Sequence, residues 1–356
     1  WNNMAFHLIV EWFQNSYKCK NDQTDCIIYS CNSYCKFRFI LHLSTFKFIK
    51  MKKIICLLLF PLVVFAQEIK TEDIEVNSLI KGTLFSLENT SSKPNLVLII
   101  AGSGPTNRNG NQLGMQNNSL KFLAEAIAND GNVAFSFDKR IITQMKEGNL
   151  DEKSLRFDDF ITDVKDIITF FKKQNKYNKI IIAGHSEGSL IGMIAAKDNA
   201  DAYISLAGAG RTIDLIITEQ IEKQAPFLKA KTEENFKILK EGKTFKLENQ
   251  MLASIFRESV QPYMISWMKY NPQVEVKKLN IPILIINGTK DIQVAESEAK
   301  LLHEANPKSE LKIIDKMNHI FKEINEDEEN IKSYSNPDLP IMNELSETIN
   351  SFIKSL

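Results

Sequence analysis

Cysteine is absent from most of this 356-residue sequence. All five cysteines come before residue 57, at Cys19, Cys26, Cys31, Cys35 and Cys56. The spacings of the first four match neither a zinc site nor a known disulfide framework. From residue 57 onward the chain can therefore form no disulfide, and covalent catalysis there would need a nucleophile other than a thiol.

Histidine is scarce as well, and the charge is close to balanced. Beyond residue 66 the histidines are His185, His303 and His319, and no two of them have a metal-ligand spacing. We therefore expect neither a metal nor an organic cofactor. Residues 67–356 contain 36 basic and 41 acidic residues, with no basic stripe and no alternation of basic and aromatic residues. Nucleic acid is not an expected partner.

The first 66 residues differ in composition from the rest. A basic start, a short apolar run and a small-residue end give residues 51–66 the pattern of a secretory signal peptide. We expect the mature protein to begin at Gln67 and to be periplasmic or secreted. The apolar run is too short for a membrane anchor, so we expect no stable membrane insertion of the mature chain. Residues 1–50 lack periodicity, and we interpret them as a disordered, mis-called upstream extension.

Residues 179–196, KIIIAGHSEGSLIGMIAA, contain the most informative motif. An apolar, β-branched run passes through G-x-S-x-G into a small-residue segment that suits a helix, which is the context of a nucleophile elbow. Only glycine fits two residues before and after the serine in so tight a turn, here Gly184 and Gly188. The pattern predicts Ser186 as a nucleophile. The helix start aims the amide of Glu187 at the same place, so this amide is a predicted oxyanion donor.

A second glycine-containing loop, AGSGPTNRNGN, begins at Ala101 after an apolar strand. Enzymes with a nucleophile elbow provide a second oxyanion N–H from a loop at this position. The amide of Ser103 is the predicted donor. A dinucleotide-binding loop is the alternative. It fits poorly, because G-x-G-x-x-G would need glycine where Asn107 stands and because Pro105 removes a donor.

The remaining pattern alternates apolar strands with amphipathic helices. It predicts a mostly parallel central sheet flanked by helices on both faces, with a helical lid inserted at about residues 211–271. The expected elements are a hairpin at 72–87, strands at 95–100, 132–137, 180–182, 202–206, 281–286 and 311–314, and helices at 119–130, 157–175, 295–306 and 341–356, the last capped by Asp338. Residues 139–155 are expected to form a polar loop.

A serine nucleophile needs a histidine as base and a carboxylic acid that orients the histidine. In proteins with a nucleophile elbow, the acid comes after the serine in the sequence and the histidine comes after the acid. His319 is the predicted base, because it lies in a loop just after a strand, whereas the ring of His185 should point away from Ser186. Asp291 follows a strand and is the predicted acid. Asp315 is its rival, and the side chain of Glu187 is better explained as an acid favoured by the helix dipole.

The motifs AGSGPTNRNGN, GHSEGS, AGAGRTIDLIITEQI, SWMKYNP, NGTKDIQV and NHIFK together resemble bacterial α/β-hydrolases described as carboxylesterases or serine-aminopeptidase-like hydrolases. The resemblance implies an α/β-hydrolase fold over residues 67–356 and gives Ser186, Asp291 and His319 the nucleophile, acid and base roles. The sequence departs from the family pattern at Ala101, where histidine is usual, and at Ile141, where glycine is usual. The first departure is expected to change the rigidity of the oxyanion loop.

The expected function is hydrolysis of carboxylic esters by a serine hydrolase through an acyl-enzyme. A serine aminopeptidase or another peptidase is the alternative, so the substrate would be a small-molecule ester or a short peptide. A peptidase of this kind needs carboxylates for the free amino group, and the lid offers Glu219, Glu222, Glu233 and Glu234. A non-catalytic binding protein on a hydrolase scaffold is a further alternative.

Overall fold

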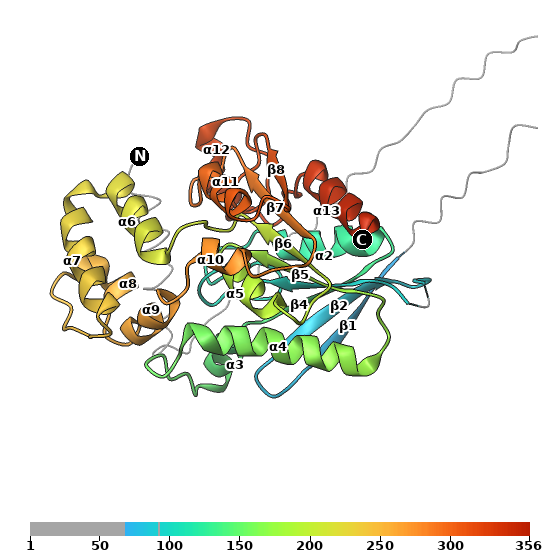
Figure 1. Ribbon diagram of the computed structural model, residues 1–356, viewed down its shortest axis with the longest axis horizontal. Helices are drawn as coiled ribbons and strands as arrows, with labels where there is room; N and C mark the ends of the chain where they lie inside the picture. Colours follow the sequence, from blue (N-terminus) through green and yellow to red (C-terminus); the bar gives the residue numbers. More distant parts are fainter. Residues whose placement is uncertain (1–67, 92) are drawn as a thin grey trace, which may run out of the picture. The chain divides into compact units, whose positions relative to one another are not determined.

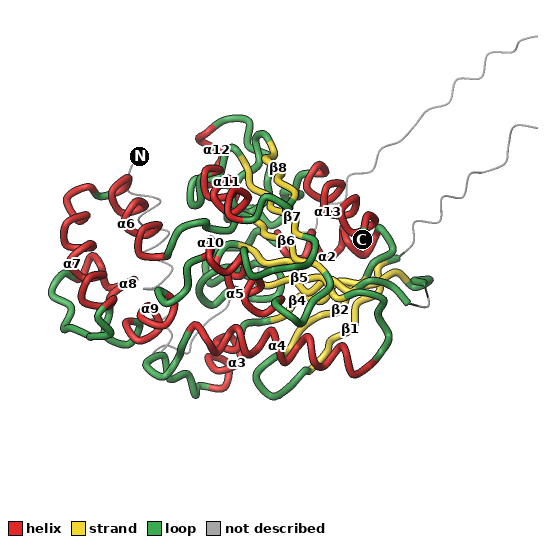
Figure 2. The backbone as a smooth tube through the Cα atoms, viewed as in Figure 1, coloured by secondary structure: helices red, strands yellow, loops and turns green. Residues whose placement is uncertain are grey.

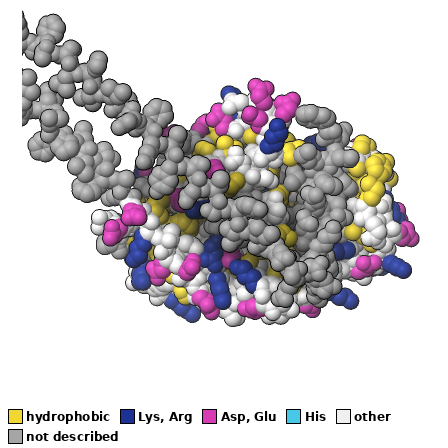
Figure 3. Space-filling view, turned by 180° about the vertical axis from the view of Figure 1, so that it is seen from behind, with side chains coloured by type: hydrophobic (Ala, Val, Ile, Leu, Met, Phe, Trp, Pro, Cys, Tyr) yellow, Lys and Arg dark blue, Asp and Glu magenta, His cyan; other side chains and the backbone are white. Residues whose placement is uncertain are grey.

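The computed structural model describes residues 68–91 and 93–356 (Figure 1). The predicted signal peptide at 51–66 and the upstream extension at 1–50 lie outside these residues. Within them, no helix is both long and apolar enough to cross a membrane. On the face seen in Figure 3, acidic and basic side chains are interspersed over the coloured surface.

An eight-stranded sheet forms the centre, with the strand order β1-β2-β4-β3-β5-β6-β7-β8. The strands are β1 Ile69–Glu75, β2 Lys81–Leu87, β3 Leu96–Ile100, β4 Val133–Phe137, β5 Ile180–His185, β6 Ala202–Leu206, β7 Ile283–Gly288 and β8 Glu310–Ile314. β2 pairs antiparallel with β1 and with β4, and all other neighbours are parallel. The predicted mostly parallel sheet is confirmed.

Side chains of alternate strand residues enter two separate apolar layers. In β3, Leu96, Leu98 and Ile100 pack on one face and Val97 and Ile99 on the other. Every residue of β3 to β7 is buried, because helices cover both faces of the sheet.

The two layers are closed by different helices (Figure 1). The first contains side chains of α4 Phe157–Gln174, α5 Glu187–Ala196, α10 Pro272–Val276 and α11 Glu296–Ala305. The second contains side chains of α2 Ser119–Asn129 and α13 Asn343–Ser355. The carboxyl ends of β3 to β7 thus lie at one edge of the covered central part of the sheet, where parallel sheets place their ligands.

Two predictions about local structure were wrong. Residues 139–155, predicted as a polar loop, contain the helix α3 Arg140–Glu147, which Gly148 ends in the left-handed conformation at φ 69°. Tertiary contact stabilises this polar helix, because Arg140 donates to Asp163 of α4 through two nitrogens, at 2.6 and 2.8 Å. The closing helix begins at Asn343 with Met342 as its N-cap residue, so Asp338 does not cap it. The short helix α12 Asp327–Ser333 was not predicted.

Residues 211–271 are helical, as predicted. They form α6 Ile213–Gln224, η2 Pro226–Leu228, α7 Lys229–Lys240, η3 Gln250–Leu252, α8 Ala253–Phe256 and α9 Gln261–Trp267. Figure 2 shows these helices to one side of the strands. They share an apolar cluster of their own, centred on Phe236, Leu239, Leu252 and Phe256. Most of the methionine and aromatic side chains of this insertion therefore pack against one another.

This separate cluster leads to a stability prediction. Phe256 is completely buried, with its ring 4.8 Å from that of Phe236. Replacing it (Phe256→Ala) is expected to lower the free energy of unfolding by about 3–5 kcal/mol, through lost burial and a residual cavity. The matched control is Phe227→Ala, since Phe227 is 72% exposed and its loss is expected to change stability by less than about 0.5 kcal/mol. Urea unfolding checks both, and equal midpoints for Phe256→Ala and the wild type would contradict the prediction.

Candidate active site

Ser186 lies in a strained turn between β5 and α5. Its backbone has φ 55° and ψ −117°, a conformation that non-glycine residues rarely adopt. A Cβ on Gly184 would lie 2.2 Å from the carbonyl oxygen of Gly188, and one on Gly188 would lie 2.5 Å from that of Ala101. Both glycines of the motif are therefore sterically required, and the strand, turn and helix have the geometry predicted for a nucleophile elbow.

Asp291 and His319 meet at the edge of the sheet. His319 Nδ1 lies 2.7 Å from Asp291 Oδ2. The other oxygen of Asp291 accepts from the backbone amides of Gln293 and Val294, both at 2.8 Å. The rival carboxylate, Asp315, is exposed and accepts from Thr289 instead. Asp291 is itself held by two backbone amides, and it fixes the His319 ring through Nδ1. The other ring nitrogen, Nε2, is therefore the one that can act as a base.

Ser186, Asp291 and His319 all line one cavity of about 810 Å³. The loop that carries His319 is fixed by the buried side chain of Asn318, whose oxygen accepts from the amides of Ile320 and Lys322. The structure thus gathers at one cavity three residues that are far apart in the sequence.

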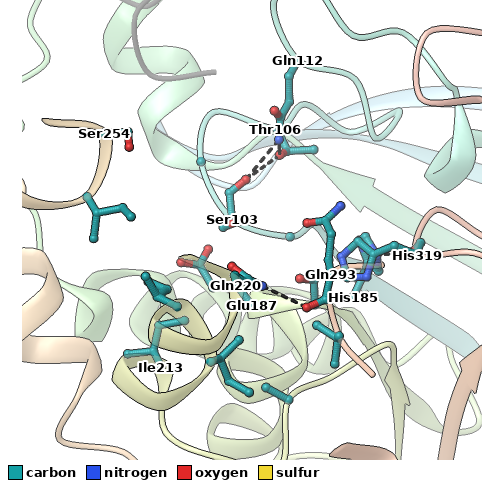
Figure 4. Close-up of a pocket in the computed structure, with 18 of the residues that line it drawn as sticks. Ser103, Thr106, Gln112, His185, Glu187, Ile213, Gln220, Ser254, Gln293 and His319 are labelled. Carbon is teal, nitrogen blue, oxygen red and sulfur yellow. Dashed lines mark hydrogen bonds between the residues drawn. The ribbon is translucent and has the colours of Figure 1, made fainter. Parts of the chain in front are cut away.

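His185 supports the His319 backbone. Its Nε2 lies 2.9 Å from the carbonyl oxygen of His319, and the two rings lie 4.8 Å apart (Figure 4). Burial, followed by the nearby His319, lowers the pKa of His185 from 6.5 to about 3. The ring is therefore neutral at ordinary pH, and because a carbonyl only accepts, Nε2 is the nitrogen that carries the proton.

The loop after β3 brings Ser103 to the same cavity. Its carbonyl oxygen accepts from Thr106 Oγ1 at 3.0 Å and from Gln112 Nε2 at 3.1 Å (Figure 4). Ser103 and Glu187, whose amides are the predicted oxyanion donors, both line the cavity. No acceptor within residues 68–91 and 93–356 takes up either amide.

A buried charge network beside Ser186 was not predicted. Lys139 Nζ donates to Glu187 Oε2 at 2.5 Å and to the Gly102 carbonyl at 3.1 Å, and it lies 4.4 Å from the centre of the Phe160 ring. Tyr263 of α9 donates its hydroxyl to the other oxygen of Glu187. Burial, and then the charge of Glu187, raise the pKa of Tyr263 well above its usual range, so the phenol keeps its proton.

The position of Lys139 could have given a signal. It lies two residues after the end of the apolar strand β4, at the edge where functional side chains gather, and we assigned it to a polar loop. The side chain of Glu187 does lie in the first helical turn, as expected. Its burial and its ion pair follow only from tertiary contact.

The charges that line the cavity are paired with one another. Its acidic lining residues within the described chain are Glu152, Glu187, Glu219, Asp291 and Glu298. Their charged or ionisable partners, also in the lining, are Lys139, Arg211, Lys223, Arg257 and His319. Arg211 joins two of the acids, Glu219 and Glu298. Each described carboxylate of the cavity therefore already has a hydrogen-bonded partner.

The rest of the lining is largely apolar. It includes Leu155, Phe160, Leu190, Ile217, Val260 and Met264, which come from both the sheet domain and the insertion. Gln220 of α6 also donates to the backbone of Gln293, beside Asp291, at 2.9 Å. The insertion therefore contributes to the cavity wall and contacts the loop that holds the predicted acid.

Three comparisons place this geometry among known proteins. Residues 118–327 match the family model described as serine aminopeptidase, S33. The chain is 24% identical over 261 residues to the esterase EstD of Thermotoga maritima, an alignment that covers 72% of this chain and 61% of the relative. The chain thus spans less than two thirds of that curated relative. The solved structure of Est1E from Butyrivibrio proteoclasticus superposes with a TM-score of 0.53 at 17% identity, covering 80% of this chain and 98% of that one.

The lowered pKa of His185 leads to a prediction about pH. The unfolded chain protonates this ring below about pH 6.5 and the folded protein only near pH 3, so stability is expected to fall as the pH drops between these values. This one group contributes a slope of at most about 1.4 kcal/mol per pH unit. Urea unfolding at several pH values should therefore give a shallower acid-side slope for His185→Gln than for the wild type. Identical slopes, or an NMR signal of His185 that titrates near pH 6.5, would show that the ring is not kept neutral.

Proposed function

The chain belongs to the S33 serine aminopeptidase family of α/β-hydrolases, and from this premise we propose that it cleaves carboxylic esters through an acyl-enzyme formed on Ser186. The observation that carries the proposal is the convergence at one cavity of Ser186, in its strained turn, and the pair His319–Asp291. Family membership agrees with the resemblance that the sequence motifs indicated.

In the proposed reaction, Ser186 Oγ attacks the ester carbonyl carbon while His319 Nε2 takes the hydroxyl proton. Asp291 keeps the ring in the required tautomer and stabilises its charged form, since it bonds Nδ1. The amides of Ser103 and Glu187 receive the oxyanion. His319 then gives its proton to the leaving alcohol. Water, deprotonated by the same ring, then attacks the acyl-enzyme. The bond between the acyl carbon and Ser186 Oγ breaks, His319 returns the proton to Oγ, and the carboxylic acid is released.

The paired charges favour a neutral acyl substrate over a free amino terminus. An aminopeptidase binds the substrate ammonium with a carboxylate, but each described carboxylate of the cavity already has a partner. Of the four insertion acids considered for this task, Glu219 lines the cavity, and its oxygens bond Arg211 and Lys223. The apolar remainder of the lining suits the acyl chain of an ester. The similarity to a protein named an esterase points the same way.

The first test concerns the nucleophile. Ser186→Ala is expected to lower turnover of p-nitrophenyl butyrate by about 10⁴- to 10⁶-fold, and His319→Ala by a similar factor because the three residues act as a unit. Covalent labelling by a fluorophosphonate probe is expected for the wild type and to be lost in Ser186→Ala. Ser351→Ala, an exposed serine on α13, is the matched control and should keep both properties. Full activity of Ser186→Ala would refute the assignment, and a wild type that neither turns over esters nor reacts with the probe would favour a non-catalytic scaffold.

The second test separates esterase from aminopeptidase with substrates that differ only in the amino group. Leucine p-nitrophenyl ester carries a free ammonium. N-acetyl-leucine p-nitrophenyl ester has the same side chain and leaving group, with an uncharged acetamide in place of the ammonium. We expect kcat/KM to be equal or higher for the acetylated ester, because the cavity offers no unpaired carboxylate among its described residues. A preference of about tenfold or more for the free amine, worth about 1.4 kcal/mol, would indicate an ammonium site and the peptidase alternative.

A further inference from the structure

The ammonium of Lys139 is buried among three partners that all belong to the cavity wall. Its side chain is 3% exposed and that of Glu187 is 2% exposed. One partner, Glu187, begins the elbow helix, and another, the Gly102 carbonyl, belongs to the oxyanion loop. A lysine at this depth is costly unless its charge is paired and hydrogen-bonded, as it is here. The third partner, the ring of Phe160, adds a cation–π contact.

The bond to the Gly102 carbonyl determines where the neighbouring amide points. The carbonyl of Gly102 and the N–H of Ser103 belong to the same peptide group, and the described chain contains no cis peptide. In a trans peptide these two groups point in opposite directions. Because Lys139 holds the carbonyl on its own side, the N–H of Ser103 is turned away from Lys139. The hydrogen bonds from Thr106 and Gln112 hold the next carbonyl, that of Ser103.

The same ammonium also holds the residue that supplies the second donor. The amide of Glu187 is the first of α5 and has no acceptor within its helix. Its side chain is fixed at both oxygens, by Lys139 and by Tyr263. The two segments that carry the oxyanion donors are thus tied together through one cation.

We propose that Lys139 is a positioning residue of the oxyanion hole, holding the Gly102 carbonyl and the Glu187 side chain so that the amides of Ser103 and Glu187 meet the oxyanion. This inference rests on the proposed ester hydrolysis. Lys139 acts through the two backbone segments and takes no proton from the substrate. Its hydrogen bond also polarises the Gly102–Ser103 peptide, which makes the N–H of Ser103 a stronger donor. The ion pair is therefore expected to stabilise the transition state, in which the negative oxygen forms, more than the bound ester.

The test replaces the lysine by an uncharged side chain of similar length. Lys139→Met is expected to lower kcat for p-nitrophenyl butyrate by about 10²- to 10³-fold, the usual cost of one lost oxyanion donor, while KM changes less than about threefold. Affinity for a butyl boronic acid, which forms a tetrahedral adduct with the serine, should fall by a similar factor, and affinity for butyrate should not. Lys146→Met is the matched control, a lysine of the helix α3 that follows Lys139, with a side chain that is 71% exposed, and it should behave as the wild type.

A second variant tests whether Lys139 positions the oxyanion donors or only neutralises the buried charge of Glu187. Lys139→Met leaves the carboxylate of Glu187 buried without its cation, which can prevent folding. Lys139→Met with Glu187→Gln removes both charges and keeps an acceptor for Tyr263. This double variant is expected to fold with a cooperative thermal transition and to keep the low kcat and the weak boronate binding.

The inference would be overturned if the double variant had a kcat within about threefold of the wild type. A folded Lys139→Met protein with a kcat in that range would overturn it as well. Fluorophosphonate labelling of the wild type makes this outcome distinguishable from a failure of the proposed function. If the wild type is not labelled, ester hydrolysis on Ser186 is itself wrong, and the role of Lys139 is wrong with it.

Discussion

The close crossing of β5 and α5 around Ser186 is the constraint on which the site depends. Gly184 and Gly188 lie so near each other that a single Cβ on Gly184 would meet backbone at 2.2 Å. This contact forces the positive φ of Ser186, which in turn lifts the residue to the sheet edge. The apolar layers on both faces of the sheet hold the strained turn, because β5 is central and all its residues are buried.

Charge pairing is the second feature that shapes the cavity. Carboxylates and cations from the sheet domain and from the insertion neutralise each other within the described lining, and the space they enclose is mostly apolar. Tyr263 of α9 reaches Glu187 and Gln220 of α6 reaches the loop of Asp291. The insertion is thus joined by hydrogen bonds to both sides of the candidate site. Its buried apolar cluster is distinct from those of the sheet, but Tyr263 and Trp267 pack against both it and the first sheet layer.

Much of the fold could be predicted because its signals are local. The apolar β-branched runs of β3 and β5 and the periodic face of α4 specify elements without reference to the rest of the chain. The errors arose where tertiary contact overrides local pattern. The polar helix α3 is stabilised by the pair Arg140–Asp163, and no local signal marks α13 as starting at Asn343 rather than near Asp338.

The sequence by itself determined most of the elements, their alternation, the elbow motif and the small set of residues able to act as base or acid. Residues 67–356 contain three histidines, which leaves few choices for the base. Only the tertiary structure decided which of these side chains meet. It brings Asp291, not Asp315, to His319, and it buries Lys139 against Glu187 and the oxyanion loop. The physical reason is that hydrogen bonds and ion pairs between distant segments depend on how strands are ordered in the sheet, which no local periodicity encodes.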